Sequence, residues 1–288
     1  MKTTLSRLLG AHPMRTLGIA GAAVVTTLAL VAPSTALAHN RDHGRGAVPP
    51  PPANPTSANQ IQNIDQVRTA IKAYYGDTIT DQVDPYPGDN VDKKLHTFSP
   101  TGAYAKEMAG IERDATRYLS SASHHRSRAQ KAILLDVDDT TLNTYNYEIY
   151  SNFVYDPTSN AAFVNGEAFP ATPGMPQLVN WAAGHGYTVF YLTGRPGTQR
   201  AGTIGNLEKV GYDAVPDSNL YLKDYAADTW LSSCAPSCTT IQYKSLTRAH
   251  IESMGYDIIA NFGDQYSDLS GGYADRTFKL PNPMYYLP

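Results

Sequence analysis

Two short acidic segments carry the residue types best suited to chemistry in this 288-residue chain. Asp136 and Asp138 belong to the first segment, Asp-Val-Asp-Asp-Thr, and Asp264 and Asp268 belong to the second, Gly-Asp-Gln-Tyr-Ser-Asp. Each segment follows an apolar run with the length of a buried strand. Packing alone does not explain these carboxylates, because an unpaired carboxylate is costly to bury. A divalent cation would offset their repulsion, and oxygen ligands of this kind favour Mg²⁺.

A calcium-binding loop is the main alternative for the first acidic segment. Such a loop requires glycine at its sixth position and glutamate at its twelfth. These positions hold Thr141 and Tyr147. The spacing therefore excludes an EF-hand.

A hydroxyl group and a glycine follow another apolar run. The run is Tyr187–Leu192, and Thr193 and Gly194 come directly after it. We expect a helix to begin here, so that its backbone N–H groups and the Thr193 hydroxyl can bind phosphate oxygens. The sequence thus predicts a phosphate-binding position near the acidic segments.

Two lysines are candidates for a cation at the same edge. Lys244 begins the helix expected over Lys244–Met254, and Lys223 follows a short expected strand. Either ammonium group could contact a phosphate oxygen, so the spacing alone leaves both open.

The elements that must position these groups alternate between strands and helices from residue 132 onward. The expected strands are Ala132–Val137, Tyr187–Leu192, Leu220–Leu222, Tyr256–Ala260 and Thr277–Leu280. The expected helices are Gly174–Gly184, 198–210 and Lys244–Met254. Such alternation predicts an α/β fold, a doubly wound parallel sheet with helices on both faces. Its functional groups should lie at the carboxyl ends of the strands.

The N-terminus has the pattern of an export signal. Lys2, Arg7 and Arg15 precede the apolar run Leu17–Ala32, and small residues lead to Ala38. This pattern predicts a signal peptide cleaved after Ala38, a secreted protein and no stable membrane anchor. The predicted organisation is a signal peptide over 1–38, a Pro-rich flexible leader over 39–56, an N-terminal helical region over 57–130, and a catalytic core over 131–288 with a flap at about 143–172.

The cysteine count and the net charge further limit the kinds of site and partner that this protein can have. Cys234 and Cys238 are the only cysteines. In an exported protein, this pair predicts a local disulfide, because a zinc site requires more ligands. The net charge of −3 does not provide the basic surface that a nucleic-acid polymer requires. The oligomeric state stays open.

Four segments together resemble the motifs of the haloacid dehalogenase superfamily of phosphatases. They are DVDDT, LTGR, the segment YKS with its following arginine, and GDQYSD. The chain is most similar to the class B acid phosphatases and the plant acid phosphatases and vegetative storage proteins. The endings GYDIIANFGDQYSDL and RTFKLPNPMYYLP belong to this likeness, which covers roughly residues 60–288.

The resemblance implies a role for each matched residue. Asp136 would be the nucleophile that forms an aspartyl-phosphate, and Asp138 would be the general acid and base, with a pKa raised by neighbouring carboxylates. Thr193 and Lys244 would hold the transferring oxygens, with Gly194 beside them. The residues around Lys244 match the family segment better than those around Lys223.

The resemblance also implies a Mg²⁺ cofactor. Asp136 and Asp264 would supply side-chain oxygens, and Asp138 would supply its main-chain oxygen. Asp268 would support the metal site. Because phosphatases of this superfamily have the second aspartate of the first motif, Asp138 favours a phosphatase over related ATPases and dehalogenases.

The expected function is a secreted, Mg²⁺-dependent acid phosphatase that hydrolyses small phosphate monoesters through an aspartyl-phosphate. One alternative is a narrow-specificity nucleotidase or phosphotransferase. The other is a storage or binding protein with little turnover on the same fold.

The flap contains Tyr145, Tyr147, Tyr150, Phe153 and Tyr155. These rings either stack on a leaving group or pack the flap onto the N-terminal helices, and packing is favoured.

Overall fold

The structure is a computed structural model of the whole chain. The structure describes residues 53–57, 60–61, 63–86, 93–123, 129–213 and 215–288. By its internal contacts the chain divides into two units, Met1–Ile61 and Gln62–Pro288. The predicted signal peptide and nearly all of the predicted leader lie outside the described residues, so the fold below is that of the second unit.

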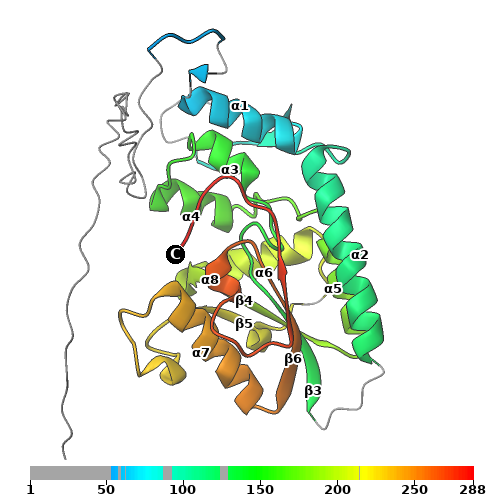
Figure 1. Cartoon of the computed structure of the whole chain (residues 1–288). Helices are drawn as coiled ribbons and strands as arrows, with labels where there is room; N and C mark the ends of the chain where they lie inside the picture. Colours follow the sequence, from blue (N-terminus) through cyan, green and yellow to red (C-terminus); the bar gives the residue numbers. More distant parts are fainter. Residues whose placement is uncertain (1–52, 58–59, 62, 87–92, 124–128, 214) are drawn as a thin grey trace, which may run out of the picture. The chain divides into compact units, whose positions relative to one another are not determined.

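The centre of this unit is a parallel five-stranded sheet (Figure 1). Its strands are β3 (Gln130–Leu135), β4 (Thr188–Pro196), β5 (Leu220–Lys223), β6 (Tyr256–Gly263) and β7 (Arg276–Lys279). Their order across the sheet is β5-β4-β3-β6-β7, and every neighbouring pair is parallel. The α/β prediction is confirmed, and each expected strand overlaps an observed one.

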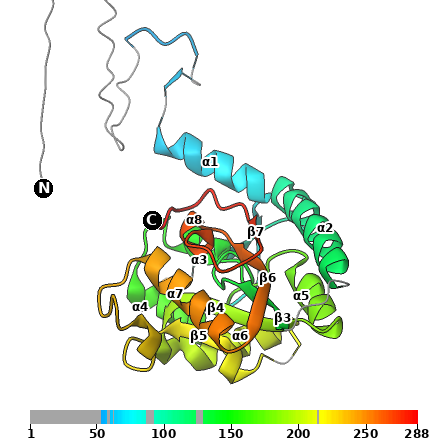
Figure 2. The same cartoon turned by 60° about the horizontal axis from the view of Figure 1, so that its bottom comes forward.

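Helices cover both faces of the sheet, as the central strand requires. They include α2 (Ala103–Ser123), α5 (Met175–Gly184), α6 (Arg200–Lys209) and α7 (Thr240–Ser253). In β3, Ile133 and Leu135 join the apolar cluster on one face, while Ala132 and Leu134 join the cluster on the other. Figures 1 and 2 show α2 and α5 on one side of the sheet and α7 on the other. Because this strand is buried on both faces, its residues form the continuous apolar run seen in the sequence.

The start of α7 differs from the prediction. The helix begins at Thr240, and Thr239 caps it through a reciprocal hydrogen-bond pair with Gln242. Lys244 therefore lies in the second turn of α7 instead of opening the helix. The capping pair explains the earlier start, because it satisfies backbone N–H groups that a helix leaves unpaired.

The end of β4 also differs from the prediction. The strand continues to Pro196, a 3₁₀ turn η2 (Gly197–Gln199) follows, and α6 begins only at Arg200. Thr193 and Gly194 thus lie in the last part of the strand, where its pairing with β5 shifts register, and not at a helix start. The backbone N–H of Arg195 donates to the Thr193 hydroxyl at 3.1 Å, a local bond within this irregularity.

The N-terminal elements and the flap pack together. They are α1 (Ile64–Tyr75), the antiparallel strands β1 (Thr78–Ile79) and β2 (His96–Thr97), α3 (Tyr145–Tyr150) and α4 (Pro157–Asn165). The buried ring of Tyr145 stacks on that of Tyr75, with 4.4 Å between centroids. Tyr147 and Tyr150 both contact the ring of Phe163. These rings pack the flap, whereas Tyr155 is exposed.

The remaining elements are short. They are η3 (Asp217–Asn219), η4 (Thr229–Leu231) and α8 (Tyr266–Leu269). The predicted disulfide between Cys234 and Cys238 is present and lies between η4 and α7.

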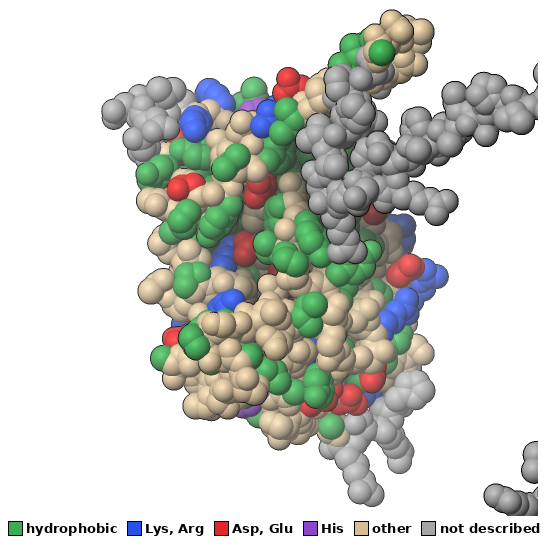
Figure 3. Space-filling model, turned by 60° about the vertical axis from the view of Figure 1, so that its left-hand side comes forward, with side chains coloured by type: hydrophobic (Ala, Val, Ile, Leu, Met, Phe, Trp, Pro, Cys, Tyr) green, Lys and Arg blue, Asp and Glu red, His purple; other side chains and the backbone are tan. Residues whose placement is uncertain are grey.

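Among the described residues, no helix combines the length and apolar character needed to cross a bilayer. On the face in Figure 3, acidic and basic side chains are interspersed among hydrophobic and other ones.

Candidate active site

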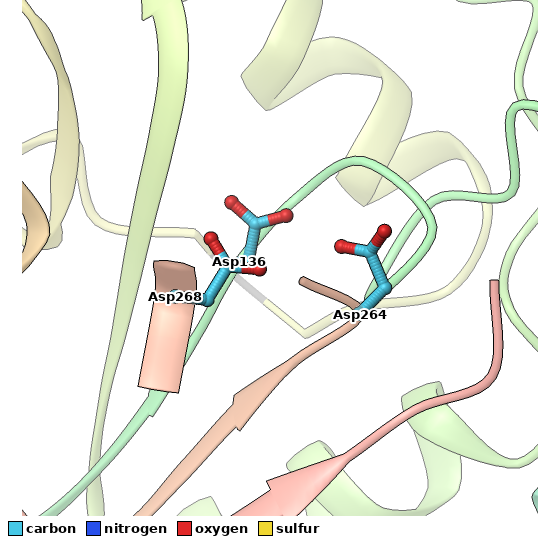
Figure 4. A group of neighbouring side chains, drawn as sticks. All are labelled: Asp136, Asp264 and Asp268. Carbon is cyan, nitrogen blue, oxygen red and sulfur yellow. The ribbon is translucent and has the colours of Figure 1, made fainter. Parts of the chain in front are cut away.

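Three aspartates converge at the carboxyl ends of β3 and β6. Asp136 directly follows β3, and its N–H donates to Phe262 O of β6 at 3.0 Å, which ties it to the neighbouring strand. Asp264 directly follows β6, and Asp268 lies in α8. One carboxylate oxygen from each lies within 4.8 Å of the others, and all three side chains are buried (Figure 4). The parallel sheet thus unites two motifs that are more than a hundred residues apart in sequence.

Lys244 is the cation that the fold brings to these carboxylates. Its Nζ contacts Asp136 Oδ1, lies 3.1 Å from Asp268 Oδ1 and donates to Leu192 O at 2.5 Å. Burial alone would lower the pKa of Lys244, but attraction by both carboxylates outweighs it and raises the pKa above its ordinary value. The rival Lys223 lies over the rings of Tyr225 and Tyr243 instead.

The carboxylates carry more negative charge than one lysine can balance. Burial, followed by the charge of Asp268, raises the pKa of Asp136 well above its usual range, although Lys244 opposes this. Burial and Asp268 likewise raise the pKa of Asp264. A buried cluster of oxygen ligands with excess negative charge suits a hard divalent cation, so these residues fit a metal.

The hydrogen bonds distinguish the three aspartates as ligands. In Asp268, Oδ1 contacts Lys244 and Oδ2 accepts from Gln265 N at 2.9 Å, so both oxygens already have partners. In Asp264, two amide donors at 2.7 Å occupy Oδ2, while among the described residues only the Thr140 hydroxyl, at 3.4 Å, donates to Oδ1. This arrangement favours Asp264 as the direct ligand and Asp268 as its support.

Asp138 is held by Arg195, a contact that the sequence analysis did not predict. Arg195 Nη2 donates to Asp138 Oδ1 at 2.7 Å, and Nε lies 3.1 Å from Oδ2. Arg195 Nη1 donates in turn to the Thr203 hydroxyl at 3.0 Å. A cation therefore faces Asp138, in addition to the carboxylates that the sequence analysis expected to perturb it. The Asp138 side chain is held in this position with 30% of it exposed.

Asp139 shapes the loop that carries the first motif. It adopts a positive φ of 54°, which L-residues rarely do. Its carboxylate accepts from Thr144 N at 3.0 Å, from the Thr144 hydroxyl at 2.5 Å and from the Tyr285 hydroxyl at 2.8 Å. Burial raises the pKa of Asp139 to about 7, against the lowering effect of these bonds. The bonds offset the backbone strain and hold the loop between Asp136 and the flap.

Of the two predicted phosphate-binding residues in β4, Thr193 is fully buried and Gly194 is exposed. The Tyr243 hydroxyl donates to Thr193 O at 3.0 Å and so connects this position to α7, next to Lys244. A Cβ atom added at Gly194 would meet no atom within 4 Å outside its chain neighbours, so the space directly beside it is open.

A family model for the HAD superfamily, subfamily IIIB (Acid phosphatase), matches residues 86–288. The chain belongs to this family. The match includes all four motifs, and the family assignment from the sequence is confirmed. Membership in an acid phosphatase family makes the chain a phosphoric monoester hydrolase.

Two plant proteins and one solved structure illustrate the relationship. "Acid phosphatase 1" of Solanum lycopersicum is 33% identical over 188 residues, covering 64% of this chain and 69% of the relative. "Vegetative storage protein 1" of Arabidopsis thaliana is 28% identical over 235 residues, covering 80% of this chain and 75% of the relative. The class C acid phosphatase from Bacillus anthracis has a TM-score of 0.51 at 22% identity, covering 63% of this chain and 80% of the other. This last likeness concerns the fold.

Four residues of this acid phosphatase site had no predicted role in the sequence. Arg195 was visible in the LTGR motif but received no role. Asn282 and Tyr285 belong to the ending RTFKLPNPMYYLP, whose contacts with Asp264 and Asp139 depend on the folded chain. Glu148 belongs to none of the four motifs, so the sequence did not single it out.

Glu148, in the flap helix α3, is an acid whose environment disfavours its charge. It is 8% exposed, and burial, together with the charge of Asp138, raises its pKa from 4.5 to about 7. The folded state therefore binds more protons than the unfolded state between these two pH values. The free energy of unfolding should fall as pH rises through this window and stay low above it.

We expect Glu148→Gln to stabilise the metal-free protein above pH 7 and to have little effect below pH 4.5. The gain should be about 1–3 kcal/mol, given that one pKa unit corresponds to about 1.4 kcal/mol. Urea unfolding in EDTA across this pH range measures it. Glu208→Gln, at an exposed position of α6, is the control and should change little. An equal gain at both ends of the pH range would contradict the prediction.

Proposed function

We propose that this protein is an exported, Mg²⁺-dependent acid phosphatase that hydrolyses small phosphate monoesters through an aspartyl-phosphate. The observation that carries the proposal is the position of Asp136. Its carboxylate lies at the end of the central strand, in contact with Lys244 and beside Asp264 and Asp268. A buried carboxylate with an adjacent cation is suited to attack phosphorus while the cation binds the phosphate oxygens.

In the first step, an oxygen of Asp136 attacks the phosphorus atom and the bond to the leaving-group oxygen breaks. Asp138 protonates that oxygen, so a neutral alcohol leaves and Asp138 becomes a carboxylate. In the second step, Asp138 removes a proton from a water molecule, and the water oxygen attacks the phosphorus atom. The bond between phosphorus and Asp136 then breaks, which releases inorganic phosphate and restores the Asp136 carboxylate. Arg195 supports this role by holding Asp138 in place.

Thr193 and Lys244 bind the transferring phosphate oxygens, and Gly194 leaves room beside them. Mg²⁺ would be held by oxygens of Asp136 and Asp264 and by the main-chain oxygen of Asp138, with Asp268 as support, and would neutralise negative charge on the phosphate. In this proposal, Lys244 favours the ionised form of Asp136, and the bound metal would act in the same direction.

Export is proposed from the N-terminal sequence and is supported by the disulfide between Cys234 and Cys238. Disulfides persist in oxidising compartments outside the cytosol. Cleavage after Ala38 can be checked by N-terminal sequencing of the protein recovered from the culture medium.

The test of the activity is hydrolysis of p-nitrophenyl phosphate between about pH 5 and pH 8, near the range in which buried carboxyl groups titrate. We expect activity with Mg²⁺, loss of activity in EDTA, and its recovery when Mg²⁺ is restored. Activity that persists unchanged after metal removal would contradict the metal requirement. If several phosphomonoesters are not hydrolysed in the presence of Mg²⁺, a narrow nucleotidase or phosphotransferase, or a storage role, would be favoured instead.

A further inference from the structure

The C-terminal segment, Leu280–Leu287, contacts the aspartates described above. After β7 it runs past α8 and the flap, as its red trace shows in Figures 1 and 2. Leu280 N donates to Gly263 O at 2.9 Å, directly before Asp264. The segment therefore begins next to the end of β6 and lies within reach of the second acidic motif.

The amide of Asn282 has only one possible orientation. Met284 N, a backbone donor, lies 2.8 Å from Asn282 Oδ1, so this atom must be the amide oxygen. The other end of the amide is then Nδ2, which lies 2.7 Å from Asp264 Oδ2. The segment's own backbone thus directs an N–H donor at the carboxylate.

This donor orients Asp264 for a cation. Gln265 Nε2 also donates to Asp264 Oδ2 at 2.7 Å, so two amides hold the same oxygen. The carboxylate plane is thereby held, and Oδ1 is the oxygen left to bind a metal. Groups that hydrogen-bond a metal ligand in this way orient it and tune its affinity.

Further contacts keep the segment in place. The Tyr285 hydroxyl donates to Asp139 at 2.8 Å, and Met284 is buried. Leu287 N donates to Gln265 Oε1 at 3.0 Å, and the Ser267 hydroxyl donates to Leu287 O at 2.9 Å. Because the segment contacts both acidic motifs, Asn282 has little freedom to leave Asp264.

We propose that Asn282 is a positioning residue for Asp264 and that the C-terminal segment is a constituent of the cation site. The inference rests on the proposed function, in which Asp264 binds the metal. Asn282 itself touches neither metal nor substrate. Its effect should therefore appear in the affinity for the cation.

The test is isothermal titration calorimetry of Mg²⁺ into the wild-type protein and the Asn282→Leu variant. Leucine has the same number of side-chain heavy atoms, branched at the same position, and its side chain has no N–H donor. We expect Mg²⁺ to bind the variant roughly 10- to 100-fold more weakly, the range seen when such supporting groups are removed. At saturating Mg²⁺, turnover should recover to within about threefold of wild type, because the ligands themselves are unchanged.

Tyr286→Ala is the matched control, because Tyr286 lies in the same segment and is 71% exposed. It should bind Mg²⁺ like the wild type. Asn282→Ala provides a second test if the leucine variant does not fold, since it also removes the donor but leaves room for water. Near-ultraviolet circular dichroism checks that each variant is folded.

The outcomes separate this inference from the proposed function. If the wild-type protein binds no divalent cation, the proposed function fails, and the inference fails with it. If the wild type binds Mg²⁺ and the Asn282 variants bind it equally well, only the inference is overturned. An equal loss in Tyr286→Ala, or reduced turnover that saturating Mg²⁺ does not restore, would also overturn it, because either result indicates general damage to the segment.

Discussion

Replacing Asp136 with asparagine should lower the turnover of p-nitrophenyl phosphate by at least about 10⁴-fold, as losses of catalytic nucleophiles do. An amide oxygen is a much weaker nucleophile than a carboxylate oxygen, and no other described carboxylate directly follows β3. The buried position accepts asparagine, which has nearly the same shape. The variant should therefore remain folded, so that the loss can be assigned to chemistry.

A covalent trap provides an independent measurement of the same step. When the reaction is stopped with acid, the wild-type protein should retain phosphorus bound to Asp136, and Asp136→Asn should retain none. Asp65→Asn is the control, because Asp65 is an exposed acid on α1 whose side chain is 84% accessible. It should keep both turnover and trapped phosphate. Trapped phosphate in Asp136→Asn would assign the nucleophile to another residue.

The sequence was sufficient for the fold and for the aspartates that follow β3 and β6. Apolar runs such as Ala132–Val137 can be recognised in the sequence as strands, because a strand buried on both faces needs apolar side chains throughout. Once the strands are known, the parallel arrangement brings Asp136 and Asp264 to one edge, as observed. These inferences use local patterns and one general rule of topology.

The parts that were missed depend on contacts between distant residues. Asn282 reaches Asp264 only because the chain turns back after β7, and Arg195 reaches Asp138 only because β4 continues past its expected end. The raised pKa of Glu148 arises from burial, which a single residue in the sequence does not reveal. Boundaries such as the start of α7 were displaced because capping by Thr239 competes with the apolar pattern.

Of the substitutions described here, Lys244→Met should lower the free energy of unfolding the most. The ammonium group of Lys244 is buried and pairs with Asp136 and Asp268. Methionine fills the space but leaves two carboxylates close together without their cation. Removing one partner of a buried ion pair costs about 3–5 kcal/mol, so the metal-free variant should lose stability by this amount. Turnover should fall as well, because the phosphate loses a positive charge.

Mg²⁺ should restore part of this stability, and more in the variant than in the wild type. Without Lys244, the carboxylates retain uncompensated negative charge, and a bound divalent cation can neutralise it. Urea unfolding of both proteins in EDTA and in Mg²⁺ measures the difference. Adding Asp268→Asn to the variant should recover stability in EDTA, since it removes one of the two repelling charges.

Lys223→Met is the matched control and decides between the two lysines. Lys223 is only partly buried and lies over two tyrosine rings, so its loss should cost no more than about 1 kcal/mol, the value of an exposed cation–π contact. Turnover should stay near that of the wild type. If Lys223→Met instead lost turnover while Lys244→Met kept it, the phosphate-binding lysine would be Lys223. Lys244 would then serve only to compensate the buried carboxylates.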